Sequence, residues 1–546
     1  MRDNKGNTFY IQGTILAAAS IITRILGLIF RIPLTDIIGD EGNGAYSNAY
    51  EIYSSALLLS TYSIPVAVSR LVSAKEAKKE YRNSFLVFKV ALVFSFIVGL
   101  LMAFLVYRFA GPLSTMLFKS ESSAIPLRAL APTIFVFAVM GVLRGFYQGK
   151  NTVIPTSISQ ILEQIVHVGL GLFLASRFMK LYAEYPNTAA FGAAGGTLGT
   201  LAGAVASLLF LLAVYCLYRP TLMRRLRKDR TEYDDPWADV LKMLLLTAVP
   251  IIINQFLFSV TGTIDSVLFN NVLAGKGVDE TVRNTLIGIY SGKFRILTNV
   301  PIAIASAIGV AIIPNIVSAY TKGTRSALYT KMSQAIKFNM LIAIPCAAGL
   351  MALATPIMAA LFPSSSERSL EISSQLMMIG GTSVIFFAYS TTTNNILQGL
   401  GKMRYPVFHA IIGIVIYLLV DFPLLKFTTM GVYALPVGYM VFPLVVAVLN
   451  FITIARETGY DQELLNTFIK PFVFSGLMGV FAFFLSKGLS FIIKSNMIVL
   501  AISVLLSIIL YAALIIFSHT IDRDEMLEFP MGGRIVGLLS RLGIRL

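Results

Sequence analysis

Long apolar stretches separated by short polar connections make up almost the whole chain. A helix that crosses a bilayer needs about 20 mostly apolar residues, and fourteen stretches reach that length. They lie at residues 8–34, 45–72, 84–110, 128–148, 156–182, 191–218, 243–271, 285–320, 334–362, 372–399, 407–427, 431–455, 468–488 and 495–518. The stretch at 285–320 is long enough to be broken or strongly tilted. We therefore predict an all-α integral membrane protein with fourteen transmembrane helices.

Composition supports the membrane class and excludes several others. Of the 546 residues, 56% are hydrophobic and only 13% are charged, whereas soluble domains carry about 25% charged residues. Two cysteines, Cys216 and Cys346, lie inside apolar stretches, so a disulfide framework or a cysteine metal cluster is not expected. Walker A loops and Ser/His/Asp arrangements are absent from the sequence. We therefore expect no enzyme activity, no cofactor and no nucleic-acid partner.

The 44 Lys and Arg residues outnumber the 28 Asp and Glu residues, which gives a formal net charge of +16. The polar connections between the predicted helices alternate between the two sides of the membrane. Most of their basic residues lie on the side that also holds both termini, and the longest basic run is 219–230. Basic connections face the cytoplasm and anionic lipids. The short polar N-terminus also lacks the features of a cleavable signal peptide. We predict a multi-pass protein of the plasma membrane with both termini in the cytoplasm, in contact with anionic membrane lipids.

Three short matches at nearly constant spacing indicate an internal repeat. Residues 70–74 match 315–319 at an offset of 245, and the segment from Gln148 to Pro155 matches that from Gln398 to Pro406 at an offset of 250. Lys89 and Lys337 are 248 residues apart, each near the start of an apolar stretch. The repeat unit is six stretches, so we predict two parallel six-helix lobes related by a pseudo-twofold axis, as in some transporters.

The predicted organisation follows from this repeat. It comprises a first lobe at 1–218, a basic linker at 219–242, a second lobe at 243–455, two additional helices at 456–518 and a basic cytoplasmic tail at 519–546. The small residues between Gly192 and Gly199 are expected to form a helix surface for close packing.

Ionisable side chains interrupt several apolar stretches. Each costs at least about 2.5–3.5 kcal/mol inside a bilayer, so it usually faces a cavity or a partner. They are Arg24, Arg31, Glu51, Arg70, Arg144, Glu163, His167, Asp265, Lys293, Arg295 and Asp421.

The basic residues of the first and eighth stretches suggest an anion site. Arg24 and Arg31 are seven residues apart and share a helix face. With Lys293, Arg295 and Glu51 they are predicted to line a water-filled cleft, where guanidinium groups suit a diphosphate. In the alternative interpretation, Arg24 or Arg31 forms a structural ion pair with Glu51.

The other ionisable residues support weaker hypotheses. Arg70 and Arg144 are candidates for the same cleft or anchors at the membrane interface. Glu163 and His167 stand four residues apart, which suits either a site or a packing pair. Asp265 and Asp421 are candidates for holding a cation such as Na⁺ with nearby carbonyl groups.

Several segments resemble the polysaccharide-biosynthesis branch of the MOP flippase superfamily, and within it the SpoVB/YtgP group of Gram-positive bacteria, which is related to the lipid II flippase MurJ. The resemblance covers nearly the whole chain and is most specific between Arg144 and Gln164. It rests on residues 23–33, 39–42, 64–70, 144–155 and 160–164.

The resemblance implies two lobes arranged in a V and two C-terminal helices that form a groove for a lipid tail. It implies that the partner is a polyprenyl-diphosphate-linked saccharide, most plausibly lipid II for peptidoglycan synthesis. Arginines of the first and eighth helices then face the cavity, at positions matched by Arg24 and approximately by Arg295 or Lys293. Some members bind sodium with an acid of the seventh helix and polar groups of later ones, which points to Asp265 and Asp421.

Our functional hypothesis is therefore a flippase that moves such a lipid from the cytoplasmic to the outer leaflet by alternating access. Coupling to Na⁺, to H⁺ or to the membrane potential alone stays open, as does contact with cell-wall synthesis proteins. Three alternatives remain: a flippase for another undecaprenyl-linked glycan, a MATE-type cation or drug antiporter, and a non-transporting scaffold for cell-wall synthases.

Overall fold

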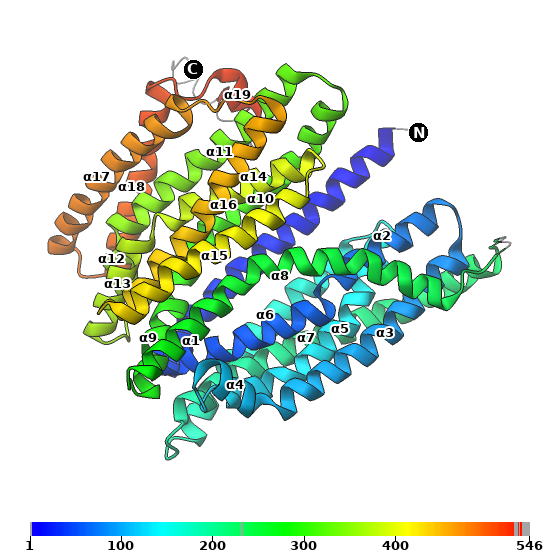
Figure 1. Cartoon of the computed structure of the whole chain (residues 1–546), viewed down its shortest axis with the longest axis horizontal. Coiled ribbons are helices and arrows are strands. Elements are labelled where there is room, and N and C mark those ends of the chain that lie inside the picture. Colours follow the sequence, from blue (N-terminus) through cyan, green and yellow to red (C-terminus); the bar gives the residue numbers. More distant parts are fainter. Residues whose placement is uncertain (1–2, 230, 232, 529–532, 534–535, 538–546) are drawn as a thin grey trace. The chain divides into compact units, whose positions relative to one another are not determined.

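The computed structural model describes residues 3–229, 231, 233–528, 533 and 536–537 (Figure 1). Within that part of the chain every regular element is a helix, which confirms the all-α prediction. By contact clustering the chain divides into two compact units, Met1–Gly292 and Lys293–Leu546.

The first unit contains nine α-helices and ends in a π-helical turn. Its α-helices are α1 (Asp3–Leu57), α2 (Ile64–Ala77), α3 (Tyr81–Arg108), α4 (Ala110–Phe118), α5 (Ala124–Gly149), α6 (Ile154–Leu181), α7 (Thr188–Arg227), α8 (Trp237–Gly275) and α9 (Glu280–Ile289). Two π-helical turns, η1 (Leu58–Tyr62) and η2 (Tyr290–Phe294), follow α1 and α9. The second π turn interrupts the long apolar stretch at 285–320, and the two units meet inside it.

The second unit continues from that turn. Its α-helices are α10 (Arg295–Thr321), α11 (Arg325–Ala352), α12 (Ala354–Leu361), α13 (Glu367–Gly380), α14 (Ser383–Gly399), α15 (Arg404–Phe427), α16 (Ala434–Thr458), α17 (Lys470–Ile492), α18 (Asn496–Phe517) and α19 (Arg523–Glu528). Short η elements precede α16 (Gly431–Tyr433) and α17 (Leu465–Ile469).

Eleven helices in the described part are long and apolar enough to cross a membrane, or up to twelve if the bent pair α13–α14 forms one span. The predicted stretches 8–34 and 45–72 are separated by a kink inside α1 at Gly39, which lies in the predicted connection between them. Gly39 has a φ of 70°, a conformation that glycine adopts without a steric penalty. The count of fourteen stays a prediction.

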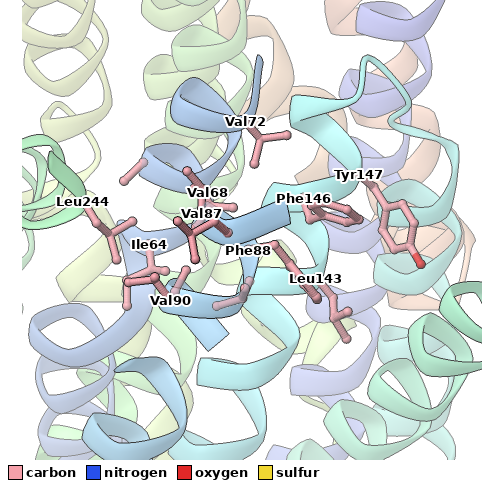
Figure 2. Packing of buried hydrophobic residues seen from close by; sticks show 14 of the residues in the cluster. Ile64, Val68, Val72, Val87, Phe88, Val90, Leu143, Phe146, Tyr147 and Leu244 are labelled. Carbon is pink, nitrogen blue, oxygen red and sulfur yellow. The ribbon is translucent and has the colours of Figure 1, made fainter. Parts of the chain in front are cut away.

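A hydrophobic core joins α2, α3, α5 and α8 in the first unit. Figure 2 shows Val68 of α2, Val87 and Phe88 of α3 and Phe146 of α5 converging in this cluster. The rings of Phe88 and Phe146 have centroids 4.4 Å apart. Gly145 lets the α5 backbone approach α2, because a Cβ there would lie 2.5 Å from the carbonyl oxygen of Pro65.

Helices α6 and α7 pack through glycines, as the small residues of α7 predicted. A Cβ on Gly195 would lie 2.5 Å from the carbonyl oxygen of Leu174, and a Cβ on Gly199 would overlap the backbone of Gly171. The close approach brings polar side chains of the two helices within hydrogen-bonding range.

The connection between α7 and α8 is shorter than the linker predicted at 219–242, because α7 continues as a helix through Arg227 and α8 begins at Trp237. Asp235 forms a salt bridge of 2.5 Å with Lys75 of α2, and its backbone N–H donates to Asn83 Oδ1 of α3 at 3.0 Å. The connection is therefore held against the ends of α2 and α3.

In the second unit, α17 and α18 pack beside α11 and α12. Ile515 of α18 clusters with Phe338 and Leu341 of α11, and the Tyr511 hydroxyl donates to the Leu341 carbonyl at 3.1 Å. The helices that lie outside the predicted repeat thus attach to a helix that lies within it.

Candidate functional site

Arg31 is held on α1 by an aromatic ring and an amide. Its guanidinium carbon lies 4.1 Å from the centre of the Tyr46 ring, and Nη1 donates to Asn43 Oδ1 at 3.3 Å. Asn43 in turn donates to Thr35 Oγ1 at 2.7 Å. Among the described carboxylates, none lies within salt-bridge distance of Arg31. Arg31 is therefore a fixed cation at the surface of α1 whose fork can take an anion.

Glu51 lies on α1 five residues after Tyr46 and contacts α8. Its Oε2 accepts a hydrogen bond of 3.0 Å from Thr263, whose hydroxyl is also 3.3 Å from that of Ser55. Asp265, further along α8, is fully buried and accepts a hydrogen bond of 2.8 Å from the Tyr290 hydroxyl. These contacts place both carboxylates where α8 meets its neighbours.

The structure brings Arg144 and Glu163 together. Arg144 of α5 forms a salt bridge of 2.7 Å with Glu163 of α6 and donates to Ser159 and Ser207 at 3.0 Å each. His167 takes other partners, because its Nε2 is 3.2 Å from Thr200 Oγ1 of α7. The helical spacing of Glu163 and His167 puts them on one helix, but each pairs with a different neighbouring helix.

Lys293 and Arg295 flank the start of α10 in the second unit and differ in exposure. Lys293 is fully buried, and its ammonium donates to Ser365 Oγ at 2.7 Å and Ser369 Oγ at 2.6 Å. Arg295 is partly exposed, with its guanidinium carbon 5.9 Å from the Tyr439 ring centre. Arg295 is thus better placed than Lys293 to reach a ligand.

Asp421 of α15 is fully buried in the second unit. The Tyr417 hydroxyl donates to its Oδ2 at 3.5 Å, and Gly438 of α16 packs so closely that a Cβ there would lie 2.7 Å from Oδ1. Within the described residues, no group of three or more His, Cys, Asp or Glu side chains gathers in a geometry that could hold a metal ion. Asp265 and Asp421 belong to different units and remain separate candidates for a cation.

Arg70 is exposed in the middle of α2, consistent with either of its interpretations. The side chain of Arg24 lies outside the described part of the structure, so its role stays a prediction.

The sequence did not predict a polar network at the start of α9. The distribution of basic residues among the connections predicts that this end of α9 is extracellular. Glu280 accepts hydrogen bonds from Ser122 Oγ at 2.7 Å, from Ser120 Oγ at 2.9 Å and from the backbone N–H of Ser122 at 3.0 Å and of Glu121 at 3.2 Å. Partial burial alone would raise the pKa of Glu280, but these hydrogen bonds outweigh it and hold the pKa below its ordinary value. The signal in the sequence was the group of serines at 120, 122 and 123.

Next to this network, α1 and α9 cross with their backbones in contact. A Cβ on Gly44 would overlap the Asn284 backbone, and a Cβ on Gly288 would overlap the backbone oxygen of Asp40. Asn284 also accepts a hydrogen bond of 3.3 Å from Asn48. The crossing and the network close the predicted extracellular end of α1, α5, α8 and α9.

A family model described as "Polysaccharide biosynthesis protein" matches residues 12–320, and one described as MatE matches residues 250–422. The lipid II flippase MurJ of Bacillus subtilis is 24% identical over 86% of this chain and 87% of its own length. Stage V sporulation protein B of the same organism is 23% identical over 96% of this chain and 99% of its own length.

Solved structures show the same fold. An inward-facing multidrug resistance MATE transporter of the MOP superfamily superposes with a TM-score of 0.64 at 18% identity, covering 80% of this chain and 94% of its own. The lipid II flippase MurJ in an inward closed conformation gives a TM-score of 0.63 at 16% identity, covering 92% and 98%. The chain therefore belongs to the polysaccharide biosynthesis protein family and is related to the lipid II flippase MurJ.

Proposed function

We propose that this protein moves a polyprenyl-diphosphate-linked saccharide, most directly lipid II, from the cytoplasmic to the outer leaflet of a bacterial plasma membrane. The relationship to a lipid II flippase over 86% of the chain supports this substrate class. The membrane location agrees with the eleven or twelve apolar helices.

The observation that carries the proposal is the environment of Arg31. A cation inside an apolar stretch is expensive unless it faces water, a partner or a ligand. Arg31 lies against Tyr46 and Asn43 with no described carboxylate in range, so its charge is only partly compensated. A guanidinium binds phosphate oxygens through two parallel hydrogen bonds. A diphosphate headgroup is the ligand of this family that would use that fork.

The closed end of α1 and α9 supports an alternating-access cycle. Because the crossing at Gly44 and Gly288 is in backbone contact, a headgroup cannot pass there in this conformation. The headgroup would enter from the cytoplasmic side, and release outside would require this crossing to open. Its contacts are hydrogen bonds and helix packing, which can break and re-form without loss of the fold.

The membrane potential can drive the cycle in the outward direction. Moving one elementary charge across 100 mV corresponds to about 2.3 kcal/mol. A headgroup with two negative charges that leaves a negative interior would gain about 4–5 kcal/mol on this basis. Coupling to Na⁺ or H⁺ is a separate proposal, for which the buried Asp265 and Asp421 are the candidates.

The test is lipid II exposure on the outer leaflet of cells depleted of their own flippase and supplied with this chain. We expect exposure to be restored, and to be lost with Arg31→Ala. Arg108→Ala is the matched control, because Arg108 is an exposed residue at the end of α3 away from the Arg31 site.

The other outcomes separate the alternatives. No rescue by a well-expressed chain would reject lipid II and favour another undecaprenyl-linked glycan. Rescue by Arg31→Ala at full efficiency would reject the headgroup site and favour a scaffold for cell-wall synthesis proteins. Efflux of cationic drugs without lipid exposure would favour the MATE-type function, which the basic charge of these helices opposes.

A further inference from the structure

Three tyrosines form a ladder on α1 next to Arg31. Tyr46, Tyr50 and Tyr53 are spaced by four and three residues, so they share one helix face. The rings of Tyr46 and Tyr50 are stacked with centroids 5.9 Å apart and an interplanar angle of 12°. Tyr50 and Tyr53 are 5.5 Å apart and tilted by 52°. A continuous row of packed aromatic rings therefore extends from the guanidinium of Arg31 along α1.

Only the middle ring is exposed. Tyr50 keeps 41% of its surface accessible, whereas Tyr46 and Tyr53 keep 3% and 2%. Both buried tyrosines pack against Tyr50 and hold its position on α1, while part of Tyr50 stays accessible.

Charged residues lie close to this group of tyrosines. The Arg31 guanidinium lies over the Tyr46 ring, and Glu51 directly follows Tyr50 in the sequence. Charged side chains do not face hydrocarbon inside a bilayer without a large cost. A partly exposed tyrosine beside such groups is therefore suited to a water-filled site and to a ligand that has both an apolar and a polar surface.

We propose that Tyr50 is the stacking platform for a sugar ring of the transported headgroup, with Arg31 holding the adjacent diphosphate. This inference rests on the function proposed above and assigns the part of the chain that contacts the saccharide. In such a headgroup the first sugar is bonded directly to the diphosphate, so both groups must bind side by side. Arg31 and Tyr50 both pack against the Tyr46 ring and meet that requirement.

The chemistry of a pyranose matches this surface. One face of the sugar consists of C–H groups that are apolar and slightly positive, and the face of an aromatic ring is negative. The hydroxyl groups around the sugar edge need hydrogen-bond acceptors, and the carboxylate of Glu51, the residue that follows Tyr50, can supply one. A bare phosphate or an acyl chain would use only one half of this arrangement.

The experiment compares two lipids that differ only in the saccharide. Purified chain in nanodiscs is titrated with lipid II and with undecaprenyl diphosphate, and the dissociation constants are measured for the parent, Tyr50→Ala, Tyr50→Phe and Arg31→Ala. Tyr107→Ala is the matched control, because Tyr107 is an exposed tyrosine of α3 with 54% of its surface accessible.

We expect Tyr50→Ala to weaken lipid II binding by about tenfold, the upper range for an aromatic contact, and to leave undecaprenyl diphosphate binding unchanged. Tyr50→Phe keeps the ring and is expected to bind both lipids like the parent. Arg31→Ala is expected to weaken both, and Tyr107→Ala neither.

The outcomes distinguish the two proposals. If the parent binds neither lipid, the proposed function fails and the platform fails with it. If the parent binds both lipids with equal affinity, or Tyr50→Ala leaves lipid II affinity intact, the platform is wrong while the proposed function stands. Loss of tetraphenylphosphonium binding in Tyr50→Ala, with lipid II affinity retained, would reject the saccharide in favour of an organic cation.

Discussion

Gly288 provides the sharpest test of how the predicted extracellular end is closed. A Cβ at this position would overlap the backbone oxygen of Asp40 on α1, and backbone cannot move aside as a side-chain tip can. Non-bonded heavy atoms are most stable at about 3.5–4.0 Å. Gly288→Ala must therefore push the two helices apart by roughly 1–2 Å.

The size of the effect follows from the contacts that this separation stretches. The hydrogen bond from Asn48 to Asn284 across the crossing is 3.3 Å. Such a bond contributes about 0.5–1.5 kcal/mol, and overpacking costs about 1–3 kcal/mol. A shift of about 1–3 kcal/mol changes the ratio of open to closed molecules by about 5- to 150-fold.

The assay is labelling of a cysteine at Ser47, which is buried beside the crossing with 5% of its surface accessible. The Ser47→Cys reporter is placed in a background in which Cys216 and Cys346 are replaced by serine. Intact cells are treated from outside with a membrane-impermeant maleimide. We expect little labelling in the parent and a faster rate with Gly288→Ala.

The matched control is Gly169→Ala on α6, where a Cβ meets nothing within 4 Å. Both substitutions replace glycine by alanine within a helix, which stabilises the helix by about 0.8–1.0 kcal/mol. The two variants therefore differ only in whether the added Cβ meets the helix crossing. Thermal unfolding in detergent checks that both variants remain folded. Equal labelling rates for the folded Gly288→Ala and Gly169→Ala proteins would refute closure by backbone contact.

Three further predictions concern charged groups. The hydrogen bonds from Ser122 and its neighbours hold the pKa of Glu280 below its ordinary value of about 4.3. They therefore stabilise the closed end while Glu280 is ionised, and this stabilisation is lost as the external pH falls through the lowered pKa. The labelling rate should therefore rise only below about pH 4.3 in the parent, and Glu280→Gln should abolish that pH dependence. Arg144→Ala leaves Glu163 without its salt-bridge partner at 2.7 Å. Both side chains are partly accessible, so we expect the free energy of unfolding, measured by chemical denaturation, to fall by about 1–3 kcal/mol, less than for a fully buried pair. Replacing both Arg144 and Glu163 by leucine should lower the free energy of unfolding less than Arg144→Ala does. An equal decrease would contradict the ion-pair account. If sodium binds at Asp421, Asp421→Asn should remove the Na⁺ dependence of lipid II exposure, whereas unchanged Na⁺ dependence would exclude that site.

Much of the fold could be predicted because membrane insertion is read from local sequence. The apolar stretches identify an all-α membrane protein, and the structure confirms that class. The glycines of α7 also predicted close helix packing, which the contacts of Gly195 and Gly199 confirm. The kink of α1 at Gly39 falls within the predicted connection between the stretches 8–34 and 45–72. Other element boundaries were harder, because the long stretch at 285–320 is interrupted by a π-helical turn that the sequence did not locate.

The candidate site was predictable as a set of residues but not as a set of contacts. Spacing put Glu163 and His167 on one helix face, yet Glu163 pairs with Arg144 and His167 pairs with Thr200. Spacing describes neighbours within one helix, whereas these partners come from α5 and α7. A single sequence carries no direct signal for such pairs.

The sequence by itself determined the membrane class, the cationic character of the spans and the resemblance to a family, because each depends on residue type and on short-range spacing. Only the tertiary structure decided which of these residues act together. The crossing of Gly288 with Asp40, the hydrogen bonds of Glu280 and the exposure of Tyr50 between two buried tyrosines all depend on which helix faces meet. Helix packing is set by the shapes of whole surfaces, so it is a property of the folded chain rather than of any one segment.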